Sequence, residues 1–288
     1  MRKELEERVT RSVLLIRHAY RHCKHRGIRL ELAYSGGKDS DVLVELCKMG
    51  GVWGDGVIRP IYRNTTIDPS GTIKHCQEVG VEILRSRMSF RDCIVRSGYP
   101  SRFQRHCCGE LKEFRVEDYV LVGIRRCESA ARMKNYKEPE VCRSYNGRGK
   151  VVQFLPLLEW SDEDVRDFVN ERGIRCHSLY YDDCGVFHVE RRLGCIGCPL
   201  ASRRNRIEDF RRHPRFVKFW VDAGAEFMRL HPNSRINGWF GDAFDWFVCN
   251  LFYDSIEAFR ASCYGGGLFG GGVWDSRAFL ESEFGISF

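Results

Sequence analysis

Two hydrophobic periods alternate along the first half of the chain. Residues 1–26 repeat apolar side chains at helical spacing, whereas residues 28–34 repeat them at every second position, as a strand does. Helical spacing returns over residues 42–49. Further strands are predicted at residues 57–62, 81–84 and 119–124, with a helix at about residues 70–79. Strands that alternate with helices predict an α/β fold with a doubly wound, mostly parallel sheet, which binds ligands beyond the carboxyl ends of its strands.

The second half of the chain has a mainly helical pattern. Residues 133–150 are polar and are predicted to form an excursion from the sheet. Ser161 and Asp164 form the two ends of a predicted capping box, and that helix ends at Gly173. One helical pattern covers residues 206–230, aromatic side chains gather at 238–259, and a glycine-rich run occupies 265–272.

These patterns divide the chain into four predicted parts. They are an N-terminal helix (residues 1–26), an α/β domain that includes a cysteine site (residues 27–204), a helical C-terminal region (residues 205–262) and a glycine-rich tail (residues 263–288).

The composition is that of a soluble globular protein. The 288 residues are 43% hydrophobic and 30% charged, enough for a large core. No apolar run is long enough to span a membrane, and the first residues carry both charge signs without the apolar stretch of a signal peptide. We therefore expect a cytoplasmic protein with no membrane partner, and the oligomeric state stays open.

The chain is moderately basic, with a net charge of +7. Several arginines gather in residues 203–215, which favours an anionic partner such as a nucleotide or nucleic acid. A solvated helix face explains the same arginines equally well, so nucleic-acid binding stays open.

The loop between the first predicted strand and the next helix carries the clearest chemistry. Residues 35–40 read Ser-Gly-Gly-Lys-Asp-Ser. Adjacent glycines permit a tight turn whose N–H groups point inward, and the following helix presents its positive end. A Walker loop requires four residues between its first glycine and its Gly-Lys pair, so the adjacency of Gly36 and Gly37 excludes it. The loop predicts a site for phosphate or sulfate oxygens.

Four of the 14 cysteines form a second pattern. Cys107 and Cys108 are adjacent, and Cys195 and Cys198 form a C-x-x-C turn that directs both sulfurs to one side. A [4Fe–4S] cluster fits best, because its separate iron corners can accept an adjacent pair. A single tetrahedral zinc ion and unligated or redox-active thiols are the alternatives.

Six segments resemble the PAPS reductase (phosphoadenosine phosphosulfate reductase) family. This family belongs to the PP-loop, adenine-nucleotide alpha-hydrolase-like superfamily. In order, the segments are residues 33–40 (AYSGGKDS), 65–69 (TTIDP), 105–112 (RHCCGELK), 123–132 (GIRRCESAAR), 155–165 (LPLLEWSDEDV) and 192–201 (RLGCIGCPLA). The resemblance covers about residues 28–220 and is closest to the cluster-bearing branch with a CC…CxxC set.

The resemblance implies an adenine-nucleotide site and a [4Fe–4S] site. The nucleotide would be PAPS, APS or ATP, with Mg²⁺ as a candidate companion, and Lys38 and Asp39 would also act in catalysis. The implied nucleotide-binding residues are Ser35, Gly36, Gly37, Lys38, Asp39, Ser40, Thr66, Asp68, Arg125, Glu128, Ser129 and Arg132. The implied cluster ligands are Cys107, Cys108, Cys195 and Cys198, with Lys112 expected near them.

One family feature is not found in this sequence. Sulfonucleotide reductases carry a Glu-Cys-Gly-(Leu/Ile)-His tail whose cysteine attacks the sulfate sulfur. Among the late cysteines, Cys249 and Cys263, we expect Cys263 to be the nucleophile, because it lies beside the glycine-rich run.

Three functions are compatible with these features. The first is an iron–sulfur enzyme that reduces PAPS or APS to sulfite with a thiol electron donor. The second is an ATP-dependent sulfur-transfer enzyme that acts on nucleic acid, by thiolation or phosphorothioation, with a sulfur donor. The third is a non-catalytic module that binds a nucleotide and a cluster. We expect an enzyme of sulfur chemistry.

Overall fold

The computed structural model describes residues 2–145, 149–264 and 274–288, and these residues form two compact units. The first unit comprises Met1–Asn64, Asp68–Ser86 and Lys112–Gly194, and the second comprises Thr65–Ile67, Arg87–Leu111 and Cys195–Phe288. This division differs from the predicted part boundaries after residues 26, 204 and 262, which stay predictions.

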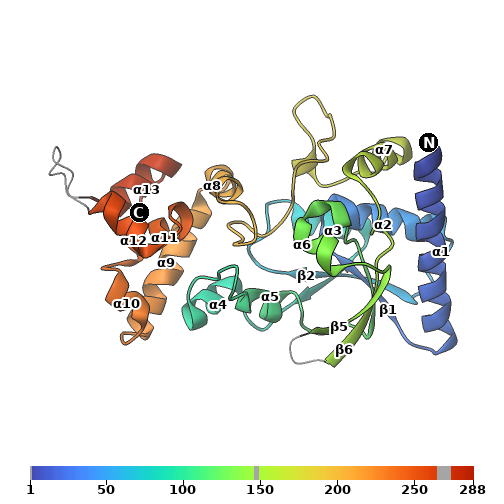
Figure 1. Cartoon of the computed structure of the whole chain (residues 1–288), viewed down its shortest axis with the longest axis horizontal. Coiled ribbons are helices and arrows are strands. Elements are labelled where there is room, and N and C mark those ends of the chain that lie inside the picture. The colour runs from blue at the N-terminus through green and yellow to red at the C-terminus, as the bar shows by residue number, and fades with distance from the viewer. Residues whose placement is uncertain (1, 146–148, 265–273) are drawn as a thin grey trace. The chain divides into compact units, whose positions relative to one another are not determined.

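The first unit contains a six-stranded sheet with the strand order β3-β2-β1-β4-β6-β5 (Figure 1). All neighbouring strands are parallel except β5 and β6, which are antiparallel. The bounds are β1 (Leu30–Tyr34), β2 (Ile58–Asn64), β3 (Glu82–Arg85), β4 (Tyr119–Val122), β5 (Glu140–Tyr145) and β6 (Gly149–Phe154). The predicted α/β fold with a mostly parallel sheet is confirmed.

Helices flank this sheet. They are α1 (Lys3–His25), α2 (Lys38–Met49), α3 (Thr72–Val79), α6 (Ala130–Asn135) and α7 (Asp162–Arg172), with the short 3₁₀ turns η1 (Arg126–Glu128) and η2 (Ser178–Tyr180). Helix α2 contacts α1, α7 and β1. Since β1 is the third strand of six and is almost wholly buried, the loop that follows it is held by the centre of the sheet.

The polar segment of residues 133–150 is not an excursion from the sheet. It contributes the end of α6, all of β5 and the start of β6. Strand β5 forms the edge of the sheet, and its described side chains alternate between partly buried and exposed. An antiparallel edge strand needs no continuous apolar run, which is why its polar sequence concealed it.

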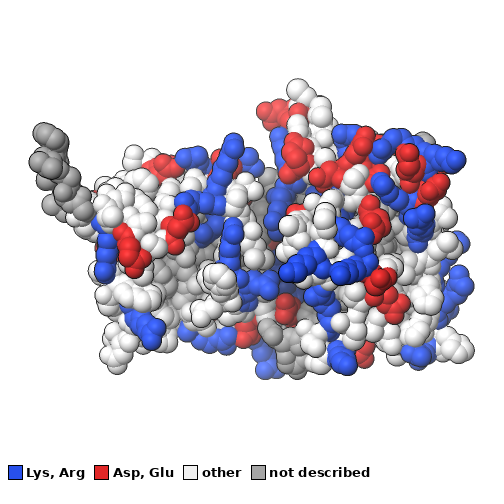
Figure 2. Space-filling model, viewed as in Figure 1, with Lys and Arg blue, Asp and Glu red and all other residues white. Residues whose placement is uncertain are grey.

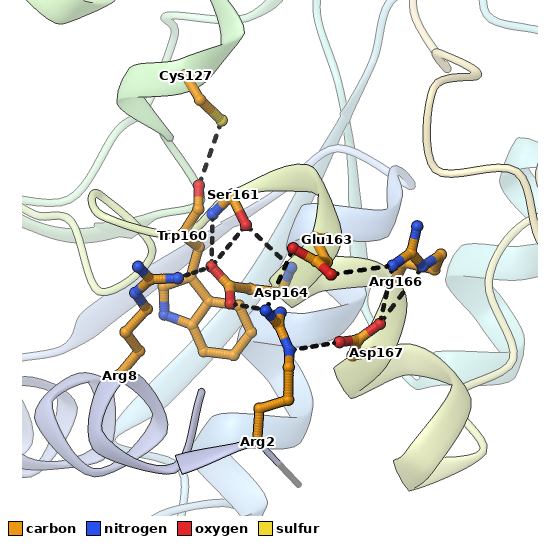
Figure 3. A network of polar contacts seen from close by, with 9 residues as sticks. All are labelled: Arg2, Arg8, Cys127, Trp160, Ser161, Glu163, Asp164, Arg166 and Asp167. Carbon is orange, nitrogen blue, oxygen red and sulfur yellow. Dashed lines mark hydrogen bonds and ion pairs between the residues drawn. The ribbon is translucent and has the colours of Figure 1, made fainter. Parts of the chain in front are cut away.

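A polar network joins the start of α1 to the start of α7 (Figure 3). Ser161 and Asp164 form the predicted capping box. Asp164 is fully buried and also contacts Arg2, 3.1 Å from Nη2 to Oδ1, and Arg8. The capping box that the sequence predicted is therefore also the anchor of the N-terminal helix.

The second unit is helical. Its helices are α4 (Phe90–Ser97), α5 (His106–Leu111), α8 (Arg203–Arg212), α9 (Arg215–Leu230), α10 (Arg235–Trp239), α11 (Ala243–Phe252), α12 (Ile256–Cys263) and α13 (Ser276–Phe284). Aromatic side chains dominate its core, among them Phe210, Trp220, Phe247 and Phe259.

Two features of the C-terminal half differ from the sequence prediction. The pattern over residues 206–230 forms two helices, because Pro214 lacks the N–H that a continuous helix needs. Within the segment expected to be a glycine-rich tail, α13 buries Leu280 and Phe284 in the aromatic core. The glycine run itself lies in residues 265–273, outside the described residues. Within the described part of the chain, no helix has the length and apolar character that crossing a membrane requires.

Candidate functional site

The loop of residues 35–40 connects β1 to α2, and both of its glycines lie close to neighbouring side chains. Gly36 has a φ of +77°, and a Cβ there would lie 2.9 Å from Cγ2 of Thr72. Gly37 is the N-cap of α2, and a Cβ there would lie 3.2 Å from the hydroxyl oxygen of Tyr180. Any larger side chain would therefore fill the space next to the first N–H groups of α2, where an anion is favoured.

The two serines hold the loop in shape. The Ser40 hydroxyl donates to the carbonyl of Gly37 at 2.6 Å and lies 3.4 Å from the Ser35 hydroxyl oxygen. The Ser35 hydroxyl accepts a hydrogen bond from the N–H of Gly37 at 3.3 Å. The loop is therefore ordered by its own side chains.

Two buried cations contact this loop: Lys38 is part of it, and Arg125 follows β4 and contacts Asp39. Lys38 is 6% exposed, and its Nζ lies 3.4 Å from Oδ2 of Asp39. Arg125, 1% exposed, places Nε 2.7 Å from Oδ1 of Asp39 and Nη2 2.8 Å from Oδ1 of Asp162. Burial lowers the pKa of Arg125, but the charge of Asp39 and the hydrogen bond to Asp162 outweigh it and raise the pKa. The guanidinium therefore stays charged within the fold.

The contact between Arg125 and Asp39 is ionic but lacks hydrogen-bond geometry. Nε of Arg125 and Oδ1 of Asp39 are both buried, and neither has a hydrogen-bond partner among the described residues. Buried polar atoms rarely stay without a hydrogen bond. Nε of Arg125 could therefore donate to a ligand, and Oδ1 of Asp39 could accept from one.

A second pair of arginines adds positive charge. Arg132 follows the N-cap Ser129, whose hydroxyl accepts from the N–H of Arg132 at 3.2 Å, and pairs with Glu128. Burial and the nearby positive charge of Arg192 lower the pKa of Arg132. Guanidinium groups held close together favour an anion near them. Arg192 was not predicted as a site residue, although it begins the last segment that resembles the family.

A buried polar network lies at the start of α2. Asp41, directly after the loop, is 4% exposed; it accepts from the hydroxyl of Tyr34 and lies 2.9 Å from Nε2 of His75. Burial raises the pKa of Asp41. Burial lowers the pKa of His75, but the hydrogen bond and charge of Asp41 outweigh this and raise it. Sequence reasoning missed this network, because its members are far apart along the chain.

The structure assigns the predicted residues Asp68 and Thr66 to different units. Asp68 belongs to the first unit and accepts from the hydroxyl of Tyr62 at 2.5 Å. Thr66 belongs to the second unit, where its hydroxyl accepts from the N–H of Phe90 at 3.0 Å. A nucleotide-binding role for either residue stays a prediction.

All four predicted cluster ligands belong to the second unit. Cys107 and Cys108 lie on α5, and Cys195 and Cys198 lie in the turn before α8. The pKa of Cys107 is raised, first by a hydrogen bond with Cys108 and then by burial. The negative charges of the Cys108, Cys195 and Cys198 thiolates raise it further. Cys107 is thus close enough to the C-x-x-C turn for both of its thiols to act on it.

The donor set fits an iron–sulfur cluster. Its four members are all partly buried thiols, which is the ligand set that [4Fe–4S] clusters use. Among the described residues, no group of three or more His, Cys, Asp or Glu side chains has an arrangement that could hold a metal ion, so the fit rests on the chemistry of the thiols.

Arg206 on α8 contacts the C-x-x-C turn. Its Nε donates to the carbonyl of Gly197 at 3.3 Å, and burial lowers its pKa to about 10 while the nearby Cys198 opposes this shift. Lys112, the cation expected near the cysteines, belongs to the first unit, so its role stays a prediction. Sequence reasoning had counted Arg206 only as part of an arginine cluster.

The remaining cysteines differ in their surroundings. Burial raises the pKa of Cys263, whereas a thiolate nucleophile needs a lowered one, and burial raises that of Cys249 to about 11. Cys127 was not predicted as a site residue, but its sulfur lies 3.2 Å from Nη1 of Arg125. The structure thus places the Cys127 thiol beside Arg125, where burial raises its pKa too, and a catalytic role for Cys263 stays a prediction.

Half of the six arginines in the cluster of residues 203–215 are neutralised by carboxylates. Three ion pairs bind its members: Arg203 with Asp254, Arg211 with Glu283 at 2.5 Å and Arg212 with Glu208 at 3.0 Å. Figure 2 shows the same mixture of charges over much of the visible surface. The three paired arginines fit a solvated helix face, and a nucleic-acid partner stays a prediction.

Two curated relatives and several solved structures are similar to this chain. An uncharacterized protein of Methanocaldococcus jannaschii is 24% identical over 237 residues, covering 77% of this chain and 54% of the relative. An uncharacterized 37.8 kDa protein of Escherichia phage 186 is 28% identical over 135 residues, covering 42% of this chain and 38% of the relative. The chain thus spans about half the length of the archaeal relative and less of the phage protein.

The solved structures are more distant. A PAPS reductase from Candida auris, in a phosphate complex, has 14% identity and a TM-score of 0.41, covering 68% of this chain and 95% of its own. An FMN adenylyltransferase from Candida glabrata in complex with ATP has 12% identity and a TM-score of 0.43, and the match covers 62% of this chain and 58% of the adenylyltransferase. The U34-tRNA thiolase NcsA from Methanococcus maripaludis, with its [4Fe–4S] cluster, has 17% identity and a TM-score of 0.35, and the match covers 76% of this chain and 79% of the thiolase.

The sequence profile of one family matches residues 29–201, more than half of the chain. The match includes the loop of residues 35–40, Arg125 and the C-x-x-C turn. This chain therefore belongs to the phosphoadenosine phosphosulfate reductase domain family.

Proposed function

We propose that this protein is an enzyme of sulfur chemistry that binds the anionic end of an adenine nucleotide at residues 35–40. The observation that carries this proposal is the convergence of a glycine-built loop, a helix N-terminus and the buried cations Lys38 and Arg125. Backbone N–H groups and buried positive charge suit phosphate and sulfate oxygens alike.

The favoured reaction is the reduction of PAPS or APS. One thiol attacks the sulfonyl sulfur and the sulfur–oxygen bond to the phosphate breaks, so that the adenosine phosphate leaves. A second thiol then releases sulfite, and the two thiols become a disulfide, which supplies both electrons. Lys38, Arg125 and Arg132 would bind the leaving phosphate and stabilise its growing negative charge.

The cysteines of the second unit support the cluster part of this proposal. Cys107, Cys108, Cys195 and Cys198 would hold a [4Fe–4S] cluster, and the positive charge of Arg206 would offset the charge of the thiolates. When bound, such a cluster would supply iron that can polarise a sulfur or oxygen ligand or exchange electrons. Zinc on the same thiols is the alternative metal.

One observation favours a second reaction, ATP-dependent sulfur transfer to nucleic acid. Asp39 lies within the anion site, and its buried Oδ1 has no hydrogen bond within the described residues. A carboxylate beside phosphates is the usual way to hold Mg²⁺-ATP, whereas it repels a sulfonucleotide that lacks a metal. Here ATP would be split so that pyrophosphate leaves and AMP activates the acceptor oxygen for replacement by sulfur.

Product analysis distinguishes these reactions. The protein, purified without oxygen, is given PAPS or APS with dithiothreitol, or Mg²⁺-ATP with DNA or RNA, and sulfite and pyrophosphate are measured. We expect sulfite release, and Lys38→Ala should lower it at least tenfold because an unneutralised phosphate is a poorer leaving group. Pyrophosphate without sulfite would favour the ATP reaction, and neither product would favour a non-catalytic module.

Iron analysis tests the cluster. We expect about four iron atoms per chain in the wild type and loss of most of the iron in Cys108→Ser and Cys195→Ser. Cys142→Ser is the matched control, because Cys142 is an exposed thiol on β5. Zinc without iron in the protein purified without oxygen would overturn the cluster assignment.

A further inference from the structure

A short turn beside the cysteine helix presents an aromatic side chain to solvent. We call residues 101–105, which precede α5, the Phe103 turn. Phe103 is 97% exposed, the highest value among the large apolar side chains of the described residues. Exposing nearly a whole phenyl ring to water forgoes about 2 kcal/mol of burial free energy, part of which a partner stacked on the ring would recover.

The turn is ordered by hydrogen bonds. The N–H of Ser101 donates to the carbonyl of Gln104 at 3.1 Å. In return, the Ser101 hydroxyl accepts from the N–H groups of Phe103 at 3.3 Å and Gln104 at 3.0 Å. Phe103 is therefore held at the tip of a closed turn, which lowers the entropy lost when a partner binds it.

Arg102 connects the Phe103 turn by hydrogen bonds to the residues that follow the C-x-x-C turn in the same unit. Its Nε donates to the carbonyl of Pro199 at 3.1 Å and its Nη2 to that of Ala201 at 3.4 Å. Leu200, between these carbonyls, is 44% exposed. The Phe103 turn and the segment after Cys198 thus form one surface.

The charge of this surface is positive and unneutralised. The hydrogen bonds of Arg102 go to carbonyl groups, which leave its full charge in place. Arg105 is exposed, and within the described ranges no carboxylate pairs with it or with Arg102. This contrasts with three of the six arginines of residues 203–215, which have a carboxylate partner.

We propose that the Phe103 turn binds single-stranded nucleic acid. A base would stack on the ring of Phe103, and Arg102 and Arg105 would contact the flanking phosphates. An exposed ring between cations is how proteins bind unpaired bases without strong sequence preference. A protein partner fits less well, because a protein-binding surface has a contiguous apolar centre, whereas here single apolar side chains lie among cations.

This proposal goes beyond the nucleotide site and does not depend on it. The Phe103 turn belongs to the second unit and Lys38 to the first. Lys38→Ala should therefore retain nucleic-acid binding while it loses turnover, so failure of one proposal leaves the other testable.

Fluorescence anisotropy with labelled 20-nucleotide DNA and RNA single strands tests the proposal on the full chain, purified without oxygen. We expect measurable binding in 50 mM salt, weakened about tenfold or more in Phe103→Ala and retained in Phe103→Trp. Phe103→Leu keeps an apolar side chain but cannot stack, so it should bind as weakly as Phe103→Ala. Arg105→Ala should reduce the salt dependence by about one phosphate contact, a slope change of about 0.7.

Two matched controls lie in the same unit. Trp239→Ala removes another exposed aromatic side chain, 42% exposed, and Lys218→Ala removes an exposed cation on α9. Both should bind as the wild type does. No binding of either strand by the wild type, or equal binding by Phe103→Leu and the wild type, would overturn the proposal. The second outcome would point to an apolar, protein-like contact instead.

Discussion

The two units build their candidate sites from different interactions. In the first unit, hydrogen bonds and ion pairs of buried polar groups hold the loop of residues 35–40. In the second, the cysteines lie against a core of aromatic rings, in which Phe210 and Trp220 pack edge to face at 5.8 Å.

This difference has a chemical consequence. The cations of the first site are matched by Asp39 and Asp162, so that site is electrostatically prepared by the protein alone. In the second site the neighbouring thiols raise the pKa of Cys107, and Arg206 lies near Cys198. Under the proposed function, the first site would need only its ligand, whereas the second would need a metal centre to hold four thiolates together. The following experiments test how far the contrast extends.

The largest effect is expected from adding one methyl group to the C-x-x-C turn. Gly197 has a φ of +73°, and a Cβ there would lie 2.5 Å from Cζ of Phe210, which is fully buried and cannot move away. Gly197→Ala should lower the free energy of unfolding by about 3 kcal/mol or more, from overpacking and backbone strain together. Urea unfolding followed by circular dichroism measures this.

The control lies in the same segment. A Cβ on Gly194 meets no atom within 4 Å, so Gly194→Ala should change stability by less than about 0.5 kcal/mol. Equal destabilisation by both variants would mean that the aromatic packing does not fix this turn.

A polar change in the first unit should have the next largest effect. Asp164 is fully buried, caps α7 and contacts Arg2 and Arg8 (Figure 3). Asp164→Asn keeps the size but removes the charge, so it should cost about 2 kcal/mol in the unfolding free energy. Glu163→Gln, at a side chain 55% exposed, is the control and should cost less than about 0.5 kcal/mol. If the two variants are alike, the buried network does not stabilise the first unit.

The loop glycine should affect binding more than stability. Gly36→Ala places a methyl group 2.9 Å from Cγ2 of Thr72 at a positive φ, and shifts the loop that would bind the nucleotide. We expect nucleotide affinity, measured by isothermal titration calorimetry, to fall about tenfold or more. Gly80→Ala is the control: Gly80 has a similar φ of +80°, but a Cβ there meets no atom within 4 Å. This variant shows the effect of backbone strain alone, without displacement of the loop. Unchanged affinity in Gly36→Ala would contradict the assignment of the loop.

The smallest expected effect is a pH dependence of the first unit. The pKa of His75 is raised in the folded protein, so its contribution to stability is complete below the unfolded pKa of about 6.5 and disappears as the pH rises through the folded value. The raised pKa of Asp41 acts in the same direction at lower pH. The unfolding free energy should fall as the pH increases from 6 to 8. His75→Gln should flatten this slope, and an unchanged slope would exclude the pair as its cause.

The sequence was most informative where chemistry and local geometry coincide. The glycine pair, the capping box of Ser161 and Asp164 and the alternation of strands and helices depend on short-range rules, and the structure bears them out. It was least informative for β5, whose polar residues form an edge strand only because β6 lies beside them.

What the sequence alone determined is the set of groups that could act: a loop for anions, four grouped cysteines and the arginines. Tertiary structure decided which of these have partners. It buried Arg125 against Asp39 and placed Cys127 beside Arg125. It also paired Arg203, Arg211 and Arg212 with carboxylates, while Arg102 and Arg105 have no carboxylate partner among the described residues. The physical reason is that charge and pKa depend on neighbours in space, and neighbours far apart in the chain leave no local pattern in the sequence.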